Sequence, residues 1–250
     1  MKKWAFGLLI LFACGERDER KPIFYEGYAF TENHLQDYST AGELIRDFFR
    51  DKKFKESYCG CKISDGKRFD PSECGYKSKF SSTNQNTREL QHEHVVPASR
   101  FGVYFPEWQP NYRPDCTSGR TCTSKYNAVY KKMEADLWNL LPVIGELNNV
   151  RSDLPPGEIP GERKEFGDCD FEYSATVFEP RPAVRGDIAR IYFYMDHKYP
   201  GLGIVADDNR EMLQKWARND PVTRQEKLLA DFIAEYQGYE NPFVSEDREP

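Results

Sequence analysis

Several features are scarce in this sequence of 250 residues, and each scarcity narrows what the protein can be. No apolar run reaches the 18 residues of a membrane-spanning helix, so no such helix is predicted. Only four histidines occur, which leaves few candidates for a histidine-rich metal site. Basic residues are outnumbered, 35 against 41 acidic residues, and the net charge of −6 gives no general attraction to nucleic acid. A polyanionic partner therefore needs a local basic patch or a metal ion.

The chain nevertheless has enough apolar material for a folded core. Hydrophobic residues make up 39% of the sequence and aromatic residues 14%, which excludes wholesale disorder. Apolar residues have clear helical spacing only outside residues 58–130. The spacing predicts helices over residues 44–49, 129–138, 146–153, 187–199, 210–217 and 224–236. A helix-start signal over residues 39–43 precedes the first of these, and Thr223 with Glu226 forms a capping box at the start of the last. A strand is predicted over residues 88–96, and the proline-rich residues 154–186 are expected to be irregular.

The N-terminus has the pattern of an export signal. Two lysines precede an apolar run over residues 4–13, which is too short to span a bilayer. The run ends at Cys14 in a pattern that resembles a bacterial lipobox. This predicts that residues 1–13 are removed as a signal peptide and that Cys14 carries lipid. An ordinary signal cleaved after Gly15 is the alternative.

The rest of the chain is expected to form one domain. Residues 14–37 begin with a run of charged residues and are interpreted as a lipid-anchored tether and N-terminal segment. Residues 38–250 contain no internal repeat and no clear linker, so a single domain is predicted there. Removal of residues 1–13 takes away two lysines and no acidic residue, which moves the net charge from −6 to −8.

Cysteine usage also indicates export. Six cysteines remain when Cys14 is set aside, an even number typical of disulfide-bonded proteins in an oxidising compartment. Cys59 and Cys61 are too close in sequence to pair easily with each other, so each is expected to pair elsewhere. Cys116 and Cys122 flank a turn-rich loop that a local disulfide could close. A zinc cluster ranks below disulfides because no cysteine pair has the usual gap of two to four residues.

The first candidate site is the polar segment Gln91-His92-Glu93-His94, which precedes Val95-Val96-Pro97. On a regular strand Glu93 and His94 point to opposite faces, but both can line one cleft if the strand ends there. Glu93 offers a carboxylate to a metal, and His94 an imidazole suited to accept a proton near neutral pH. A surface strand with two solvated histidines is the equally weighted alternative.

The second candidate site is a short helix predicted to begin at Glu146. Asn148 lies in its first turn, where an amide oxygen can reach a metal. Arg151 is three residues further on the same face and could contact a phosphate. Helix capping by Asn148 and a solvent-facing Arg151 is the simpler alternative for each residue alone.

Together these segments resemble the endonuclease I family of bacterial secreted nucleases. The ordered match spans roughly residues 58–244 and is carried by Glu93-His94-Val95-Val96-Pro97-Ala98, Lys132-Met133-Glu134-x-Asp136-Leu137-x-Asn139-Leu140-x-Pro142, Gly145-Glu146-Leu147-Asn148-x-x-Arg151, Arg185-Gly186-x-Ile188-Ala189-Arg190-x-Tyr192-Phe193-Tyr194-Met195 and Asn241-Pro242-Phe243-Val244. This chain differs from many members in carrying His92 where they have an aromatic residue, and in being acidic where they are basic.

The resemblance implies an α+β fold with a ββα-metal nuclease core of short antiparallel strands and one helix, surrounded by helices and long loops. It implies that His94 is the general base and that Glu93 and Asn148 hold one Mg²⁺, for which Mn²⁺ or Ca²⁺ can substitute. Arg120 matches a phosphate-binding arginine, and Glu134 matches an acid near the site that orients either Arg120 or a metal-bound water. Phosphodiester hydrolysis would then leave 5′-phosphate and 3′-hydroxyl ends.

The resemblance thus predicts a monomeric, sequence-nonspecific endonuclease acting on DNA, with RNA as a second substrate. The expected location is the periplasm or the cell surface as a lipoprotein, with secretion as the alternative, and the only membrane contact is the lipid on Cys14. Two other functions stay open. One is a secreted zinc hydrolase that uses His92 and His94 and takes a third ligand from His34 or His197. The other is a catalytically inactive binding lipoprotein.

Overall fold

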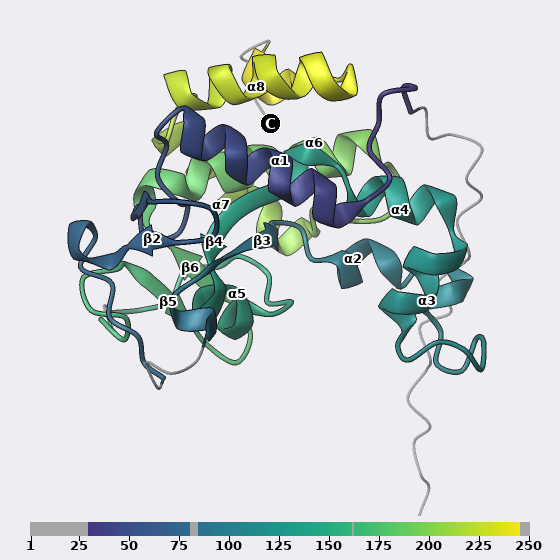
Figure 1. Cartoon of the computed structure of the whole chain (residues 1–250), viewed down its shortest axis with the longest axis horizontal. Coiled ribbons are helices and arrows are strands. Elements are labelled where there is room, and N and C mark those ends of the chain that lie inside the picture. The colour runs from purple at the N-terminus through teal and green to yellow at the C-terminus, as the bar shows by residue number, and fades with distance from the viewer. Residues whose placement is uncertain (1–29, 81–84, 162, 246–250) are drawn as a thin grey trace, which may run out of the picture.

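The computed structural model describes residues 30–80, 85–161 and 163–245 (Figure 1). The predicted signal peptide and Cys14 lie outside these residues. Helices and three small antiparallel sheets of two strands each make up the described chain, in agreement with the predicted α+β class. No helix in these ranges is both long and apolar enough to cross a membrane.

The centre of the fold is a pair of antiparallel strands followed by a helix. Strand β3 (Leu90–His94) pairs with β4 (Leu140–Ile144), and α5 (Gly145–Arg151) continues directly from β4. Every residue of β4 is buried. Pro142 lies opposite His92 in the register, and its carbonyl accepts a hydrogen bond from the Ser57 N–H at 3.0 Å. A proline is tolerated here because β4 has only one strand neighbour and needs no N–H on its other edge.

Helix α1 (Tyr38–Asp51) packs against this strand pair. Helix α8 (Arg224–Gln237) lies beside α1, on the side away from the strands (Figure 1). Asp37 begins α1 by accepting a hydrogen bond from the Thr40 N–H, so the helix starts just before the predicted start signal over residues 39–43. The rings of Phe48 and Phe232 stack at 4.2 Å between α1 and α8. α1 is therefore fixed at both faces, which matters because its first turn forms part of the site described below.

The helix predicted over residues 187–199 is confirmed as α6 (Arg185–Lys198), which is buried along most of its length. α7 (Asp207–Asn219) packs against it. The predicted capping box of α8 is present, with Thr223 and Glu226 bonding each other's backbone N–H groups. Helical periodicity thus identified the three C-terminal helices correctly.

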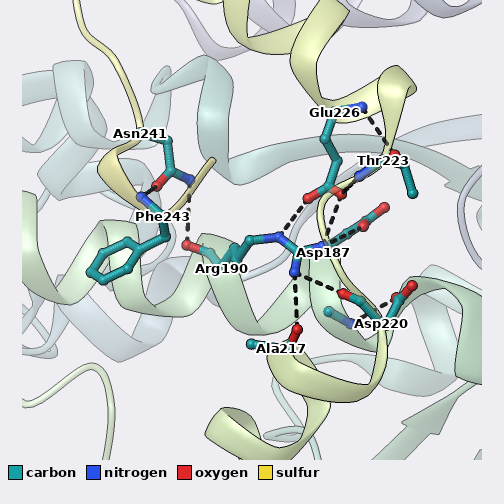
Figure 2. Close-up of polar contacts among 9 residues, drawn as sticks. Asp187, Arg190, Ala217, Asp220, Thr223, Glu226, Asn241 and Phe243 are labelled. Carbon is teal, nitrogen blue, oxygen red and sulfur yellow. Dashed lines mark hydrogen bonds and ion pairs between the residues drawn. The ribbon is translucent and has the colours of Figure 1, made fainter. Parts of the chain in front are cut away.

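A buried ion-pair network joins these helices (Figure 2). Arg190 on α6 donates to both carboxylate oxygens of Glu226, at 2.7 and 2.8 Å, and to Asp187 at 3.1 Å. The same guanidinium donates to the Asp220 carbonyl at 2.8 Å, and the Asn241 side chain donates to the Arg190 carbonyl. A buried arginine with this many partners is a structural anchor, because loss of a partner would leave its charge uncompensated.

Short elements are where the prediction was wrong. Residues 154–186 were expected to be irregular but contain a small sheet of β5 (Phe171–Tyr173) and β6 (Phe178–Pro180). Strands of three residues are too short to show alternation of apolar and polar residues. The predicted helix over residues 129–138 is α4 (Ala128–Glu134) followed by a separate turn of 3₁₀ helix. The remaining elements are β1 (Lys62–Ile63), β2 (Phe69–Asp70), α2 (Ala98–Gly102) and α9 (Pro242–Ser245).

The segment between Cys116 and Cys122 also differs from the predicted loop. Ser118 caps α3 (Gly119–Tyr126) by accepting a hydrogen bond from the Thr121 N–H. The helix therefore begins inside the segment, because a serine N-cap outweighs the turn propensity of the residues around it.

All six cysteines of the described chain form disulfides, as predicted. The pairs are Cys59–Cys169, Cys61–Cys74 and Cys116–Cys122. Glu56 lies beside the first two pairs, and its buried carboxylate accepts hydrogen bonds from the backbone N–H groups of Cys59 and Cys61. Because both sulfurs are in disulfides, this group has no thiolate to offer a metal.

We expect removal of the Cys59–Cys169 disulfide to lower the free energy of unfolding more than removal of Cys61–Cys74. The first pair closes a loop of 110 residues and the second one of 13. Loop-closure entropy gives about 5 kcal/mol for the longer loop and about 3 kcal/mol for the shorter. Urea unfolding of the two double-alanine variants measures the difference. The prediction fails if the two losses are equal, or if denatured, unreduced protein shows six reactive thiols.

Candidate functional site

A cleft of about 450 Å³ lies where β3, α5, and the first turns of α1 and α3 meet. It brings together residues that are far apart in the sequence. The side chains of the predicted site that line it are Glu93, His94, Arg120, Asn148 and Arg151, together with Tyr38, His92 and Trp108. Glu134 does not line this cleft but contacts Arg120 from behind.

Glu93 is buried and held by two partners on the same oxygen. The Tyr58 hydroxyl donates to its Oε1 at 2.6 Å, and the Arg151 Nη1 lies 2.8 Å from that atom. Burial raises the pKa of Glu93 above its usual value, and the positive charge of Arg151 opposes this rise. These contacts fix the carboxylate in place and leave Oε2 as the oxygen that can serve a ligand in the cleft.

The position of Arg151 differs from both expectations for it. It is neither exposed to solvent nor presented to a phosphate, since its side chain is only 1% exposed. Its guanidinium pairs with Glu93 and donates to the backbone carbonyls of His94 and Val95. Arg151 therefore connects α5 to the end of β3 and positions Glu93. The sequence placed it on the correct helix face but could not show its depth.

His94 is arranged as a neutral imidazole with one nitrogen available. Its Nε2 lies 2.8 Å from the backbone carbonyl of Glu134. A carbonyl can only accept a hydrogen bond, so Nε2 carries the proton and Nδ1 keeps its lone pair. Burial, aided by the nearby charge of Arg120, lowers the pKa of His94 to about 3. The ring stacks on Tyr38 with centroids 4.5 Å apart, which fixes its orientation.

His92 lies on the same face of β3 as His94, because the strand keeps its register with β4 through His94. β3 ends at His94, and Glu93 and His94 both line the cleft. Both rings contact Tyr38. The His92 ring nevertheless packs against Gly42, and its Nε2 lies 2.8 Å from Arg46 Nη1. His92 Nε2 accepts from the Arg46 guanidinium, and its Nδ1 is turned toward Gly42. Neither nitrogen is presented to a metal shared with His94, which argues against a zinc site built on these two histidines.

Arg120 and Glu134 form a pair at the edge of the cleft. Arg120 Nε donates to Glu134 Oε1 at 2.8 Å, and the Ser124 hydroxyl donates to Glu134 Oε2 at 2.9 Å. The Glu134 side chain is 5% exposed, whereas that of Arg120 is 45% exposed. Arg120 also lies over the Tyr38 ring at 5.2 Å, and its Nη2 is 3.5 Å from His94 Nδ1. This geometry is consistent with Glu134 orienting a cation that remains accessible.

Asn148, on α5, supplies a second side-chain oxygen to the lining of the cleft. Its side-chain nitrogen donates to Gln91 Oε1 at 3.0 Å, and Gln91 in turn donates to Asn86. This chain of hydrogen bonds sets the orientation of the amide, with its oxygen accepting from no group of the described chain. Glu93 and Asn148 are thus the residues that could hold a metal. A donor set of oxygens suits Mg²⁺, Mn²⁺ or Ca²⁺ better than zinc.

Sequence reasoning missed two tyrosines of the site. Tyr38 is the first residue of α1 and touches His94, Arg120 and the carbonyl of His92, to which its hydroxyl donates at 2.6 Å. Tyr58 fixes Glu93. Neither lies in a motif, because each reaches the site only through the packing of segments remote in sequence. A lone tyrosine just before a helix start gave no usable signal.

Comparison with known proteins gives consistent matches over most of the chain. A sequence profile of the Endonuclease I family matches residues 31–248. The chain is 34% identical over 219 residues to an extracellular deoxyribonuclease of Aeromonas hydrophila, covering 84% of this chain and 90% of that protein. It is 36% identical over 194 residues to a periplasmic deoxyribonuclease of the same species, covering 75% and 76%. It is 35% identical over 192 residues to Endonuclease-1 of Buchnera aphidicola, covering 75% and 72%.

Proposed function

The chain belongs to the endonuclease I family, and on this premise we propose that it is an exported, sequence-nonspecific endonuclease that hydrolyses phosphodiester bonds of DNA. The observation that carries the proposal is the state of His94. Its Nε2 is occupied by a backbone carbonyl while Nδ1 points its lone pair toward a cleft that also contains Arg120, Glu93 and Asn148. A base, a phosphate-binding cation and two oxygen ligands in one cleft fit hydrolysis of a phosphodiester.

In this mechanism His94 Nδ1 takes a proton from the attacking water, while Nε2 keeps its own proton and continues to donate it in a hydrogen bond to the Glu134 carbonyl. The Tyr38 ring, stacked on the imidazole, holds its orientation for this transfer. A phosphate bound at Arg120 neutralises the cation that lies 3.5 Å from Nδ1, and this raises the proton affinity of His94 when substrate is present. The base is therefore weak in the free protein and stronger in the complex. Attack on phosphorus would leave 5′-phosphate and 3′-hydroxyl ends.

The residues Glu93 and Asn148 would hold one Mg²⁺. Burial and the contacts with Tyr58 and Arg151 keep the carboxylate in a single orientation, and the hydrogen bond to Gln91 does the same for the amide. When bound, the ion supplies positive charge to the phosphate and to the departing 3′ oxygen. Mn²⁺ or Ca²⁺ can occupy the same oxygen set.

Arg120 would bind a phosphate oxygen of the substrate, with Glu134 keeping the guanidinium in place from the side away from the cleft. The Cys116–Cys122 disulfide lies in the same short segment and limits its movement. Arg151 has no direct contact with substrate in this proposal, because its guanidinium is committed to Glu93 and two carbonyls.

Export is supported by the three disulfides and by relatives named as extracellular and periplasmic deoxyribonucleases. A lipid on Cys14 and a monomeric state remain part of the proposal and rest on the sequence alone.

A DNA zymogram tests the proposal. We expect a cleared band with Mg²⁺, no band with EDTA, and recovery when Mg²⁺ is added back, because the oxygen ligands release the ion to a chelator. Zn²⁺ alone should not restore the band. Activity that persists in EDTA would contradict the metal assignment, and activity with Zn²⁺ alone would favour the zinc hydrolase. No activity under any condition would favour the binding lipoprotein.

A further inference from the structure

A second hollow of about 490 Å³ adjoins the cleft and shares two of its residues, Tyr38 and Arg120. It runs between the start of α1 on one side and α3 and α4 on the other. We call it the lysine groove, and it is lined by Gln36, Asp37, Tyr38, Ser39, Arg120, Thr121, Ser124, Lys125, Lys131 and Glu134. Because Tyr38 and Arg120 form a common wall, a polymer held at Arg120 has a direct path into this groove.

The groups exposed in the lysine groove are those that contact nucleic-acid backbones. Two ammonium groups, on Lys125 and Lys131, and the hydroxyls of Ser39 and Thr121 line it. Amines and hydroxyls supply most contacts to phosphate and sugar, and such contacts carry no base preference. Nothing apolar besides the Tyr38 ring lines the groove, so it does not suit an apolar ligand.

The two carboxylates of the groove are already engaged in hydrogen bonds within the protein. Glu134 is almost fully buried and receives hydrogen bonds from Arg120 and Ser124. Asp37 caps α1, accepting from both the N–H and the hydroxyl of Thr40. Lys125 pairs with Asp115 at 2.7 Å, but both side chains are well exposed, and such pairs are weak enough to exchange for a phosphate.

The cleft itself offers little exposed positive charge besides Arg120. Arg151, which also lines it, is only 1% exposed, and Asp153 adds a carboxylate. Among the cations that line these two hollows of the described chain, a polyanionic strand bound at Arg120 therefore finds its nearest further ones in the lysine groove, at Lys125 and Lys131.

We propose that the lysine groove binds the phosphates that neighbour the scissile phosphate on the same DNA strand, through Lys125 and Lys131. The inference rests on the proposed nuclease function. It identifies the local basic patch that a chain with a net charge of −6 needs in order to hold a polyanion.

The test compares the double variant Lys125→Ala/Lys131→Ala with the matched control Lys215→Ala/Lys227→Ala. Lys215 is 56% exposed and paired with Glu158, much as Lys125 is 53% exposed and paired with Asp115, and both control lysines lie on α7 and α8, away from the cleft. The first measurement is kcat/KM on oligonucleotides from two to about 16 nucleotides long. The second is fluorescence anisotropy of a labelled strand of about 16 nucleotides in EDTA, with salt varied from about 50 to 200 mM.

In wild type and control, kcat/KM should rise with oligonucleotide length, and in the double variant this rise should be about tenfold smaller at low salt. The slope of log affinity against log salt should be shallower by about 0.7 to 0.9 for each lysine removed. Equal losses on dinucleotide and long substrate, or a double variant that binds like the control, would overturn the lysine groove. Anisotropy in EDTA needs no turnover. If the wild-type protein cleaves no substrate but binds the labelled strand with the predicted salt dependence, the nuclease function is refuted and the lysine groove is supported.

Discussion

Replacing His94 with alanine should lower kcat/KM for DNA by about 10²–10⁴-fold, the usual loss for a missing general base. Nδ1 of His94 is the proton acceptor in the proposed mechanism, Nε2 is bonded to the Glu134 carbonyl, and the proposed metal ligands are Glu93 and Asn148 instead. Excess Mg²⁺ should therefore leave the variant inactive, whereas added imidazole should restore part of the rate. Steady-state kinetics across a range of Mg²⁺ and imidazole concentrations measures both effects.

His92→Ala is the matched control for this prediction. His92 lies on the same face of β3 and also contacts Tyr38, but its Nε2 is bonded to Arg46. Its removal should reduce stability through the loss of packing against Gly42, with little effect on the rate of the folded protein. The assignment is wrong if His92→Ala lowers the rate as much as His94→Ala, or if high Mg²⁺ rescues the His94 variant. The first result would favour a zinc site formed by His92 and His94.

The main helices and the polar strand could be predicted because their signals are local. Apolar spacing alone identified α6, and Thr223 with Glu226 marked the start of α8. The disulfide framework followed from an even count of cysteines, although the partners of Cys59 and Cys61 did not. Long-range pairing of this kind depends on the packed fold, and no local pattern encodes it.

The candidate site was predictable in its membership but less so in its arrangement. Motif residues Glu93, His94, Arg120 and Asn148 do line one cleft. Burial depth cannot be read from a local motif, however, and for this reason Arg151 was expected either to contact a phosphate or to face solvent. A buried carboxylate needs a cationic or hydrogen-bonding partner, so the burial of Glu93 in itself requires a residue such as Arg151 beside it. Knowing that Glu93 is buried would have predicted its partner.

The depth of Glu93 leads to the second large effect, on stability as well as activity. Glu93→Ala removes a proposed metal ligand and also leaves the guanidinium of Arg151, 1% exposed, without its counter-ion. Breaking one side of a buried pair costs about 3–5 kcal/mol, and we expect a loss of unfolding free energy in this range in urea. Activity at saturating Mg²⁺ should recover little, because Arg151 also holds the carbonyls of His94 and Val95 and these shift when it loses its partner.

Asn148→Ala is the variant that separates the two effects. Asn148 is half-buried, and its side chain is bonded only to Gln91 among the described residues, so its loss should cost about 1 kcal/mol of stability and mainly weaken the binding of Mg²⁺. Activity of this variant should recover in large part as Mg²⁺ is raised, which a titration of rate against metal concentration measures. If Glu93→Ala is as stable as wild type, the ion pair with Arg151 does not support the fold. If Mg²⁺ rescues neither variant, the two residues do not share a metal, and Glu93 would then act only by placing Arg151 against the end of β3.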